Sequence, residues 1–140
     1  MEKDKAPAGV AGQNMTDRYG VIGHPISHSK SPVIHRLFAE ATGQDLSYEA
    51  IDIPPEHLAT RVRQLFADGY RGLNVTVPHE TDVVKLTSRL TSRAELAGAV
   101  NTLIVHADGA VEGDNTDGTG LVNDLRQNLR TRLAGTRILI

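Results

Sequence analysis

The sequence contains no cysteine and no tryptophan, and these two absences narrow its chemistry at once. Without cysteine the chain cannot form a disulfide, present a thiol nucleophile or hold zinc through thiolates. This composition fits the reducing cytoplasm, which we take as the expected location. With only two Phe and three Tyr, stacking of nucleic-acid bases on aromatic side chains is not an expected function.

Long apolar runs and an excess of one charge are also missing. No run approaches the ~20 apolar residues that a membrane span requires. The formal net charge is -2, which gives no electrostatic case for nucleic acid or an anionic membrane as a partner. The six histidines show no metal-ligand spacing, so we expect no metal site. The remaining composition, 39% hydrophobic and 23% charged over 140 residues, is typical of one globular domain.

Apolar strands and amphipathic helices alternate along the chain. We expect strands at 19–22, 47–53, 71–77, 99–106 and 111–113. We expect helices at 32–42, 56–68, 78–87 and 92–97, and a last one through Leu121 and Leu129. The Asp108-Gly109 pair predicts a hairpin, so part of the sheet should be antiparallel. The pattern predicts a three-layer α/β/α domain with a mixed, mostly parallel sheet.

The ends of the chain differ from its middle. Residues 1–17 are small and polar without periodicity, and we interpret them as a disordered leader. Residues 18–118 form the expected folded domain and 119–134 a linking helix. Gly135 precedes an apolar run, so we expect a further strand over 135–140. Such a strand would be an unpaired edge, so we expect a homodimer or pairing with a C-terminal domain.

The stretch LNVTVPHE at 73–80 carries the strongest site signal. Asn74 and Thr76 lie two residues apart in a strand, so their side chains leave the same face. Pro78 suits the first turn of a helix. We therefore expect two polar side chains beside a helix N-terminus, where α/β proteins place ligand sites. Alternatively, Asn74 and Thr76 only satisfy the local turn.

Three further polar clusters stand at expected strand ends or loops. Ser29 and Ser31 precede the helix at Pro32, where two hydroxyls and free backbone amides form a cradle for a carboxylate or phosphate. The alternative is that Ser31 only caps that helix. Asn101 lies within GAVNT, and Asp117 lies within NTDG.

Together, these clusters resemble the N-terminal, substrate-binding domain of the shikimate dehydrogenases. The matching stretches are VIGHPISHSKSP, LNVTVPH, LAGAVNT and GDNTDGTG, and the resemblance covers residues 19–140. Four stretches in this order and spacing are specific, although each alone is weak. The resemblance implies an α/β/α domain that binds shikimate or 3-dehydroshikimate in a cleft. That cleft would face a C-terminal domain that holds NADP.

The resemblance also implies roles for individual residues. Ser29 and Ser31 would bind the substrate carboxylate, and Thr76, Asn101 and Asp117 would hold ring hydroxyls. The implied reaction, a step of chorismate and aromatic amino acid biosynthesis, is the NADP-dependent interconversion of 3-dehydroshikimate and shikimate. In it a lysine, paired with the aspartate that matches Asp117, assists proton transfer. Such a positioned group contributes about 10²- to 10⁴-fold.

Two departures from the family pattern bear on activity. Glu80 stands where the family has the catalytic lysine, so the catalytic positions are Asp117 and Glu80. A glutamate cannot supply a positive charge, and we expect strongly reduced dehydrogenase activity. Lys85 would lie roughly 140° further around a helix and is a poor substitute. In addition, the chain ends within the first strand of the family's dinucleotide-binding domain, and no Gly-rich phosphate loop follows, so we expect no cofactor-binding residue here.

Two other interpretations stay open. The chain could be a non-catalytic binding protein for shikimate-like acids, which Glu80 and the absent phosphate loop favour. It could also be related to quinate or aminoshikimate dehydrogenases, with altered chemistry at Glu80. Among the histidines, His28 and His79 are expected beside the cleft, whereas His35 and His57 are expected on the surface of helices.

Overall fold

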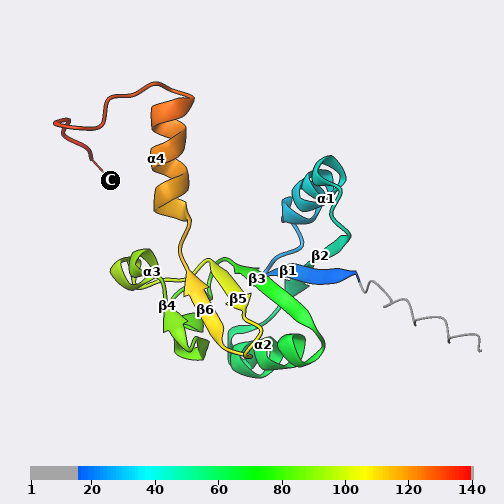
Figure 1. The fold of residues 1–140 in the computed structure, drawn as a ribbon. Helices are drawn as coiled ribbons and strands as arrows, with labels where there is room; N and C mark the ends of the chain where they lie inside the picture. Colours follow the sequence, from blue (N-terminus) through cyan, green and yellow to red (C-terminus); the bar gives the residue numbers. More distant parts are fainter. Residues whose placement is uncertain (1–15, 140) are drawn as a thin grey trace, which may run out of the picture.

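The computed structural model describes residues 16–139, and its centre is one mixed β-sheet (Figure 1). Within these residues the six strands are β1 (Asp17–Gly23), β2 (Leu46–Asp52), β3 (Tyr70–Val75), β4 (Arg89–Leu90), β5 (Thr102–Val105) and β6 (Val111–Asp114). Their spatial order is β2-β1-β3-β5-β6-β4. The β1–β2, β1–β3 and β4–β6 pairs are parallel, and β5 is antiparallel to both of its neighbours. The expected mixed, mostly parallel sheet is confirmed.

Helices lie on both faces of this sheet. They are α1 (Ser31–Thr42), α2 (Leu58–Ala67), α3 (Ser92–Ala97) and α4 (Asp117–Gln127), with short 3₁₀ turns at Pro55–His57 and Val83–Leu86. Figure 1 shows α2 under the sheet and α1 and α4 on the opposite side, where α4 projects away from the end of β6. This arrangement is the predicted α/β/α architecture.

The hydrophobic core lies between the sheet and α2. Apolar residues at i, i+4 and i+7 of α2, namely Leu58, Val62 and Leu65, are buried there. Opposite them, Ile22 of β1 and Leu73 of β3 are almost completely buried. A β-branched or aliphatic side chain at every second strand position supplies this face of the sheet. The core therefore fixes β1 and β3, whose carboxyl ends carry the predicted site.

The helix predicted from Pro78 is not formed. The chain turns instead over residues 76–82, and the Val77–Pro78 peptide bond is cis. His79 explains the turn: its side chain is 1% exposed and Nε2 donates to the carbonyl oxygen of Ile53 at 2.7 Å. Its amide donates to the carbonyl oxygen of Thr76 at 3.1 Å. The chain returns to a helical turn only at the 3₁₀ segment Val83–Leu86, where the amide of Val83 donates to the carbonyl oxygen of His79 at 2.9 Å.

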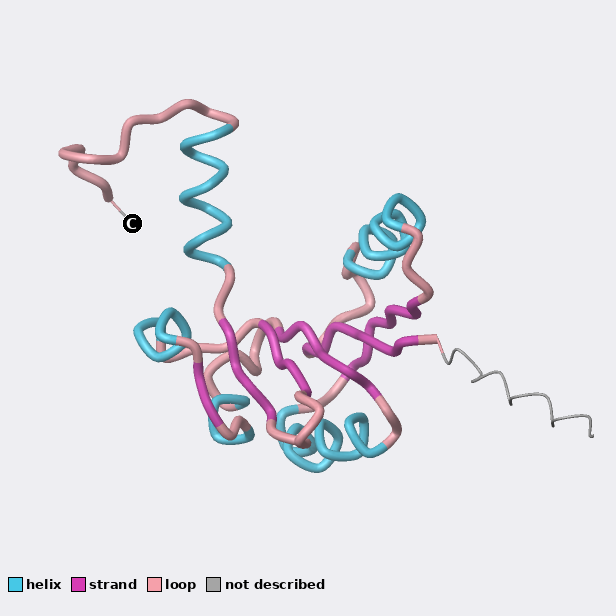
Figure 2. Tube along the Cα trace, viewed as in Figure 1, coloured by secondary structure: helices cyan, strands magenta, loops and turns pink. Residues whose placement is uncertain are grey.

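The two ends also differ from expectation. β1 already begins at Asp17, and the rest of the predicted leader, residues 1–15, lies outside the described residues. The segment after α4 is a loop through residue 139 (Figure 2), and Ile140 lies outside the described residues. Residues 136–139 pair with none of the six strands, so the strand predicted over 135–140 is not present there. α4 buries none of its side chains. Within residues 16–139 no helix has the length and apolar content that a membrane crossing needs.

Candidate functional site

A cavity of about 390 Å³ lies at the carboxyl ends of β1 and β3, beside the first turns of α1 and α4. We call it the polar cavity. Seven of its nine lining residues are polar, and the complete lining is Val21, Ser31, His35, Asn74, Val75, Thr76, Glu80, Asn101 and Asp117. The structure thus brings together five of the six predicted site residues: Ser31, Thr76, Glu80, Asn101 and Asp117. Ligand sites of parallel sheets form at this edge because loops from several strands converge there.

Ser29 and Ser31 have different positions at the start of α1. The hydroxyl of Ser29 accepts a hydrogen bond from the amide of Ser31 at 3.2 Å, and Lys30 occupies the N-cap position without a side-chain cap. Ser31 therefore does not cap the helix, and its side chain lines the cavity. Ser29 does not line the cavity, but it holds the backbone that places Ser31. Of the first amides of α1, that of Ser31 already donates to Ser29 and Pro32 has none, so the positive dipole end of the helix is what favours an anion here.

Asn74 and Thr76 both line the cavity, as their spacing in the strand predicts. The amide of Thr76 donates to the carbonyl oxygen of Ile22 at 3.0 Å, so strand-like pairing extends one residue beyond β3. This pairing fixes the backbone of Thr76 relative to β1. Both side chains are half-buried, and the Asn74 amide is already bonded at both ends, to Tyr48 and Thr102, so Thr76 is the better placed of the two to meet a ligand.

Asn101 and Asp117 are joined directly. The Nδ2 amide of Asn101 donates to Oδ1 of Asp117 at 2.8 Å and to Oγ1 of Thr116 at 2.9 Å. Its Oδ1 accepts from the amide of Thr116 at 3.1 Å. Asp117 is the first residue of α4, where a helix dipole stabilises a negative charge. The pair therefore presents a fixed carboxylate to the cavity.

Glu80 lines the cavity, and within residues 16–139 its carboxylate takes part in no hydrogen bond or ion pair. Its carbonyl oxygen accepts from the amide of Val100 at 2.8 Å, which ties its backbone to the loop before Asn101. Lys85 does not line the cavity and instead pairs with Asp82 at 3.0 Å. The polar cavity accordingly has two carboxylates in its lining and neither lysine nor arginine.

Asp114 lies outside the cavity lining but stabilises the turn before Asp117, and it was not predicted from the sequence. Its side chain is buried, and it accepts hydrogen bonds from Nε of Arg93 and from the hydroxyl of Thr91, both at 2.6 Å. The amide of Asn115 donates to the same carboxylate at 2.8 Å. The Arg93 guanidinium, followed by the Thr91 and Asn115 donors, holds the pKa of Asp114 well below its usual range. Asp114 thereby anchors the turn that leads to Asp117.

Two aromatic residues beside the cavity were also missed. His35 is half-buried rather than on the surface, and its ring stacks on that of Tyr48 with centroids 3.8 Å apart. Its Nδ1 donates to the carbonyl oxygen of Ser31 at 3.0 Å. The spacing of four residues from Ser31 was an available signal, because such residues share one face of a helix. Tyr48 gave no signal, because it is brought close only by the pairing of β2 with β1.

Three other histidines, His28, His57 and His79, do not line the polar cavity. His79 was expected beside the cleft, but its side chain is buried against Ile53 and does not line the cavity. His28 is exposed and does not line it either, and His57 is exposed as expected. Within residues 16–139 no cluster of three or more His, Asp or Glu side chains could hold a metal ion.

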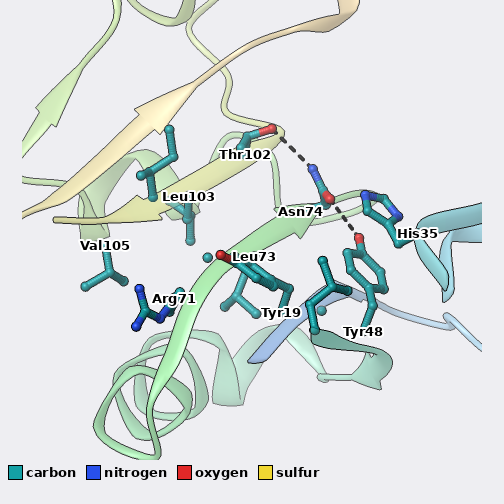
Figure 3. Close-up of a pocket in the computed structure, with 13 residues that line it drawn as sticks. Tyr19, His35, Tyr48, Arg71, Leu73, Asn74, Thr102, Leu103 and Val105 are labelled. Atoms are coloured by element: carbon teal, nitrogen blue, oxygen red, sulfur yellow. Dashed lines mark hydrogen bonds between the residues drawn. The ribbon is translucent and has the colours of Figure 1, made fainter. Parts of the chain in front are cut away.

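A second cavity of about 390 Å³ adjoins the first along the sheet (Figure 3). It shares Asn74 and His35 with the polar cavity, and the rest of its lining is mainly apolar and aromatic, including Tyr19, Tyr48 and Leu103. We call it the apolar cavity. Asn74 lies on the boundary between the two.

Comparison with known families agrees with this geometry. Residues 21–103 match the model of the shikimate dehydrogenase substrate binding domain, which is more than half of the chain. This chain belongs to that family. The region matched contains Ser29, Ser31, Thr76, Glu80 and Asn101, while Asp117 lies beyond it.

Individual members extend the match towards α4. Shikimate dehydrogenase (NADP(+)) of Thioalkalivibrio sulfidiphilus is 56% identical over 124 residues, which are 89% of this chain and 45% of that protein. The structure of shikimate 5-dehydrogenase from Thermus thermophilus with NADP(H) and shikimate superposes with a TM-score of 0.75 at 35% identity, over 80% of this chain and 42% of that one. The chain therefore spans less than half the length of these relatives.

The same fold also occurs with a different named substrate. The ligand-free 5-ketofructose reductase of Gluconobacter sp. strain CHM43 superposes with a TM-score of 0.81 at 27% identity, over 89% of this chain and 44% of that one. Fold similarity alone does not select the ligand, so the substrate of this shikimate dehydrogenase family domain has to be argued from the polar cavity itself.

Proposed function

We propose that the polar cavity binds shikimate or 3-dehydroshikimate, as the substrate half of an NADP-dependent shikimate dehydrogenase. The observation that supports this most directly is the convergence of Ser31, Thr76, Asn101 and Asp117 on one cavity. A small polyhydroxy acid needs an anion cradle at one end and hydrogen-bonding partners for its hydroxyls at the other. The hydroxyl of Ser31, at the positive dipole end of α1, would supply the former, and Asn101 with Asp117 would supply the latter.

In this proposal each residue of the cavity contacts a particular group of the substrate. The hydroxyl of Ser31 would donate to the substrate carboxylate, with Ser29 holding the backbone in place. Asp117 would accept a hydrogen bond from a ring hydroxyl, because Asn101 already stabilises its negative charge through the 2.8 Å hydrogen bond. Thr76 would contact a second hydroxyl from the end of β3.

We do not expect the residues of this chain to hold NADP. A nucleotide phosphate requires a Gly-rich loop or basic side chains, and the sequence has no such loop after a strand. The two carboxylates of the polar cavity would also repel phosphate. We therefore assign NADP to the part of the relatives that this chain does not span, and the expected function of these residues is to bind and orient the substrate.

Titration calorimetry with shikimate tests the proposal on this chain. We expect saturable binding, and we expect Asn101→Ala to weaken it by about tenfold or more, because the mutation removes a ring-hydroxyl partner and frees Asp117. Asn123→Ala, an exposed change of the same type on α4, should leave the affinity unchanged. Addition of NADP should not alter binding. Absence of binding at millimolar shikimate, or equal affinities of the two variants, would contradict the proposal.

A second candidate ligand is an amino-substituted shikimate. Glu80 and Asp117 both line the cavity without a lysine or arginine, and an ammonium group on the ring would replace the missing positive charge. Titration with the amino analogue in the same experiment separates the two. Tighter binding of the amino analogue that is lost in Glu80→Gln would favour this candidate over shikimate.

A further inference from the structure

A continuous series of hydrogen bonds runs from β2 to α4 beside the polar cavity. The hydroxyl of Tyr48 donates to Oδ1 of Asn74 at 2.7 Å, and Nδ2 of Asn74 donates to Oγ1 of Thr102 at 3.2 Å (Figure 3). The hydroxyl of Thr102 donates to Oδ1 of Asn101 at 2.9 Å. Nδ2 of Asn101 then donates to Oδ1 of Asp117 at 2.8 Å. We call these five residues the hydroxyl–amide chain.

Each donor in this chain points towards Asp117, and contacts at both ends agree on this direction. A tyrosine or threonine hydroxyl has a single proton to donate, whereas an asparagine side chain has one accepting end and one donating end of nearly the same shape. Tyr48 donates to Oδ1 of Asn74, and Nδ2 of Asn74 donates to Thr102 and to the carbonyl oxygen of Asn101. Thr102 then donates to Oδ1 of Asn101, the same atom that accepts from the backbone amide of Thr116.

Tyr48 is held firmly at its end of the hydroxyl–amide chain. Its ring stacks on that of His35 at 3.8 Å with 9° between the planes, and His35 is fixed to the carbonyl oxygen of Ser31. Burial raises the pKa of Tyr48, so its hydroxyl keeps its proton. The stack links the start of α1 to the hydroxyl–amide chain. Ser31 at one end of the polar cavity and Asp117 at the other are therefore connected through neighbouring contacts.

We infer that Tyr48 is a positioning residue, which steadies the Asn74 and Asn101 amides and, through Asn101, the Asp117 carboxylate, without touching the substrate. Tyr48 does not line the polar cavity, whereas Asn74, Asn101 and Asp117 do. Its effect on substrate rests on the proposed function, but its effect on Asn101 can be measured without any ligand. Removal of its hydroxyl would leave Oδ1 of Asn74 without this donor and would loosen the hydrogen bonds from Asn74 to Thr102 and from Thr102 to Asn101, while the amide of Thr116 still holds Asn101.

Tyr48→Phe tests this inference, because it removes one oxygen and keeps the ring that stacks on His35. The matched control is Tyr70→Phe, whose hydroxyl donates to Oε1 of Glu49 at 3.0 Å and lies outside the hydroxyl–amide chain. The first readout is nuclear magnetic resonance of the ligand-free chain. We expect the Nδ2 protons of Asn101 to shift and to exchange with water about fivefold faster in Tyr48→Phe, and to be unchanged in Tyr70→Phe.

The second readout is the affinity for shikimate, which we expect to fall about fivefold in Tyr48→Phe relative to Tyr70→Phe. Thr102→Val interrupts the chain at its middle and should produce the same two effects, which keeps the test valid if Tyr48→Phe does not fold. Unchanged Asn101 signals in both chain variants would overturn the inference. If the unmodified chain binds no shikimate, the proposed function fails, and the Asn101 signals still decide the role of Tyr48.

Discussion

At the scale of single residues, Asp114 shows how a buried carboxylate can determine the shape of a site that it does not touch. Its oxygens accept from Arg93, Thr91 and the amide of Asn115, and these contacts hold the turn that ends at Asp117. A buried charge is stable only when its partners are complete, so removal of the carboxylate leaves several donors unsatisfied. The position of Asp117 therefore depends on a residue three places before it.

We predict that Asp114→Ala lowers the free energy of unfolding by about 2 kcal/mol, because hydrogen bonds to a charged group are lost. The contribution depends on pH. The folded pKa of Asp114 lies below the unfolded value of about 3.9, so the stabilisation is present above about pH 4 and is lost as the pH falls towards the folded pKa. Urea unfolding near pH 7 and below pH 4 measures both effects.

The control for that experiment is Asp82→Ala, which removes an exposed carboxylate paired with Lys85. An exposed ion pair contributes less than about 1 kcal/mol, so Asp82→Ala should change stability little. Two outcomes would contradict the role assigned to Asp114. One is that Asp114→Ala lowers the free energy of unfolding no more than Asp82→Ala does; the other is that the difference in stability between wild type and Asp114→Ala grows below pH 4.

The sequence predicted those site residues whose signal is local. Ser31 and Thr76 lie in stretches whose strand ends and helix starts periodicity and turn residues indicate, whereas Asn101 and Asp117 were singled out by the family resemblance of their local motifs. Tyr48 and Asp114 were missed because their partners are distant in sequence. Tyr48 meets Asn74 across 26 residues, and Asp114 meets Arg93 across 21. No local pattern encodes such a contact.

At the scale of elements, β3 and β5 approach each other closely because Gly72 has no side chain. Gly72 pairs with Ile104 in the antiparallel ladder. A Cβ atom at Gly72 would lie 2.9 Å from the carbonyl oxygen of Leu103, which is backbone and cannot move aside cheaply. The close contact keeps Asn74 and Thr102 within hydrogen-bonding distance two residues further along.

Gly72→Ala should therefore destabilise the fold by about 2 kcal/mol, the usual cost of forcing extra atoms into a packed contact. Thermal and urea unfolding would measure it. Gly120→Ala is the matched control, because nothing lies within 4 Å of the added Cβ in α4. Alanine is favoured over glycine in a helix by about 1 kcal/mol, so this variant should be neutral or slightly stabilised. Equal stabilities of the two variants would refute the argument for Gly72.

Helices and strands were predicted correctly where their periodic pattern covers many residues, and less well where the pattern is short or the local structure involves contacts distant in sequence. The alternation of strands with helices gave the α/β/α class and the hairpin between β5 and β6. In place of the helix expected from Pro78 there is a turn followed by the 3₁₀ segment Val83–Leu86, and the turn carries His79, which bonds to Ile53, 26 residues away. The two-residue strand β4 is too short to leave a periodic signal. The apolar residues of α1 did fall on a helix, but Val33, Leu37 and Phe38 are exposed.

At the scale of the whole molecule, the chain spans less than half of its relatives, and the polar cavity that it contains is lined by two carboxylates and no lysine or arginine. Glu80 stands where the resemblance implies a lysine, and it contributes a second carboxylate beside Asp117. A lysine there would assist proton transfer at the substrate hydroxyl and offset the charge of Asp117. The Glu80 carbonyl oxygen accepts from the amide of Val100 at 2.8 Å, so we expect a change of this side chain to leave the local backbone in place.

Fusion of this chain to the remaining half of the Thioalkalivibrio sulfidiphilus relative provides a test of activity. We predict that Glu80→Lys raises the rate of shikimate-dependent NADP reduction by about 10²-fold or more, the usual contribution of a positioned acid–base group. Glu56→Lys makes the same charge change at an exposed position far from the cavity and should leave the rate unchanged. Equal rates for both variants, with shikimate still bound, would instead favour a binding protein whose cavity is not organised for hydride transfer.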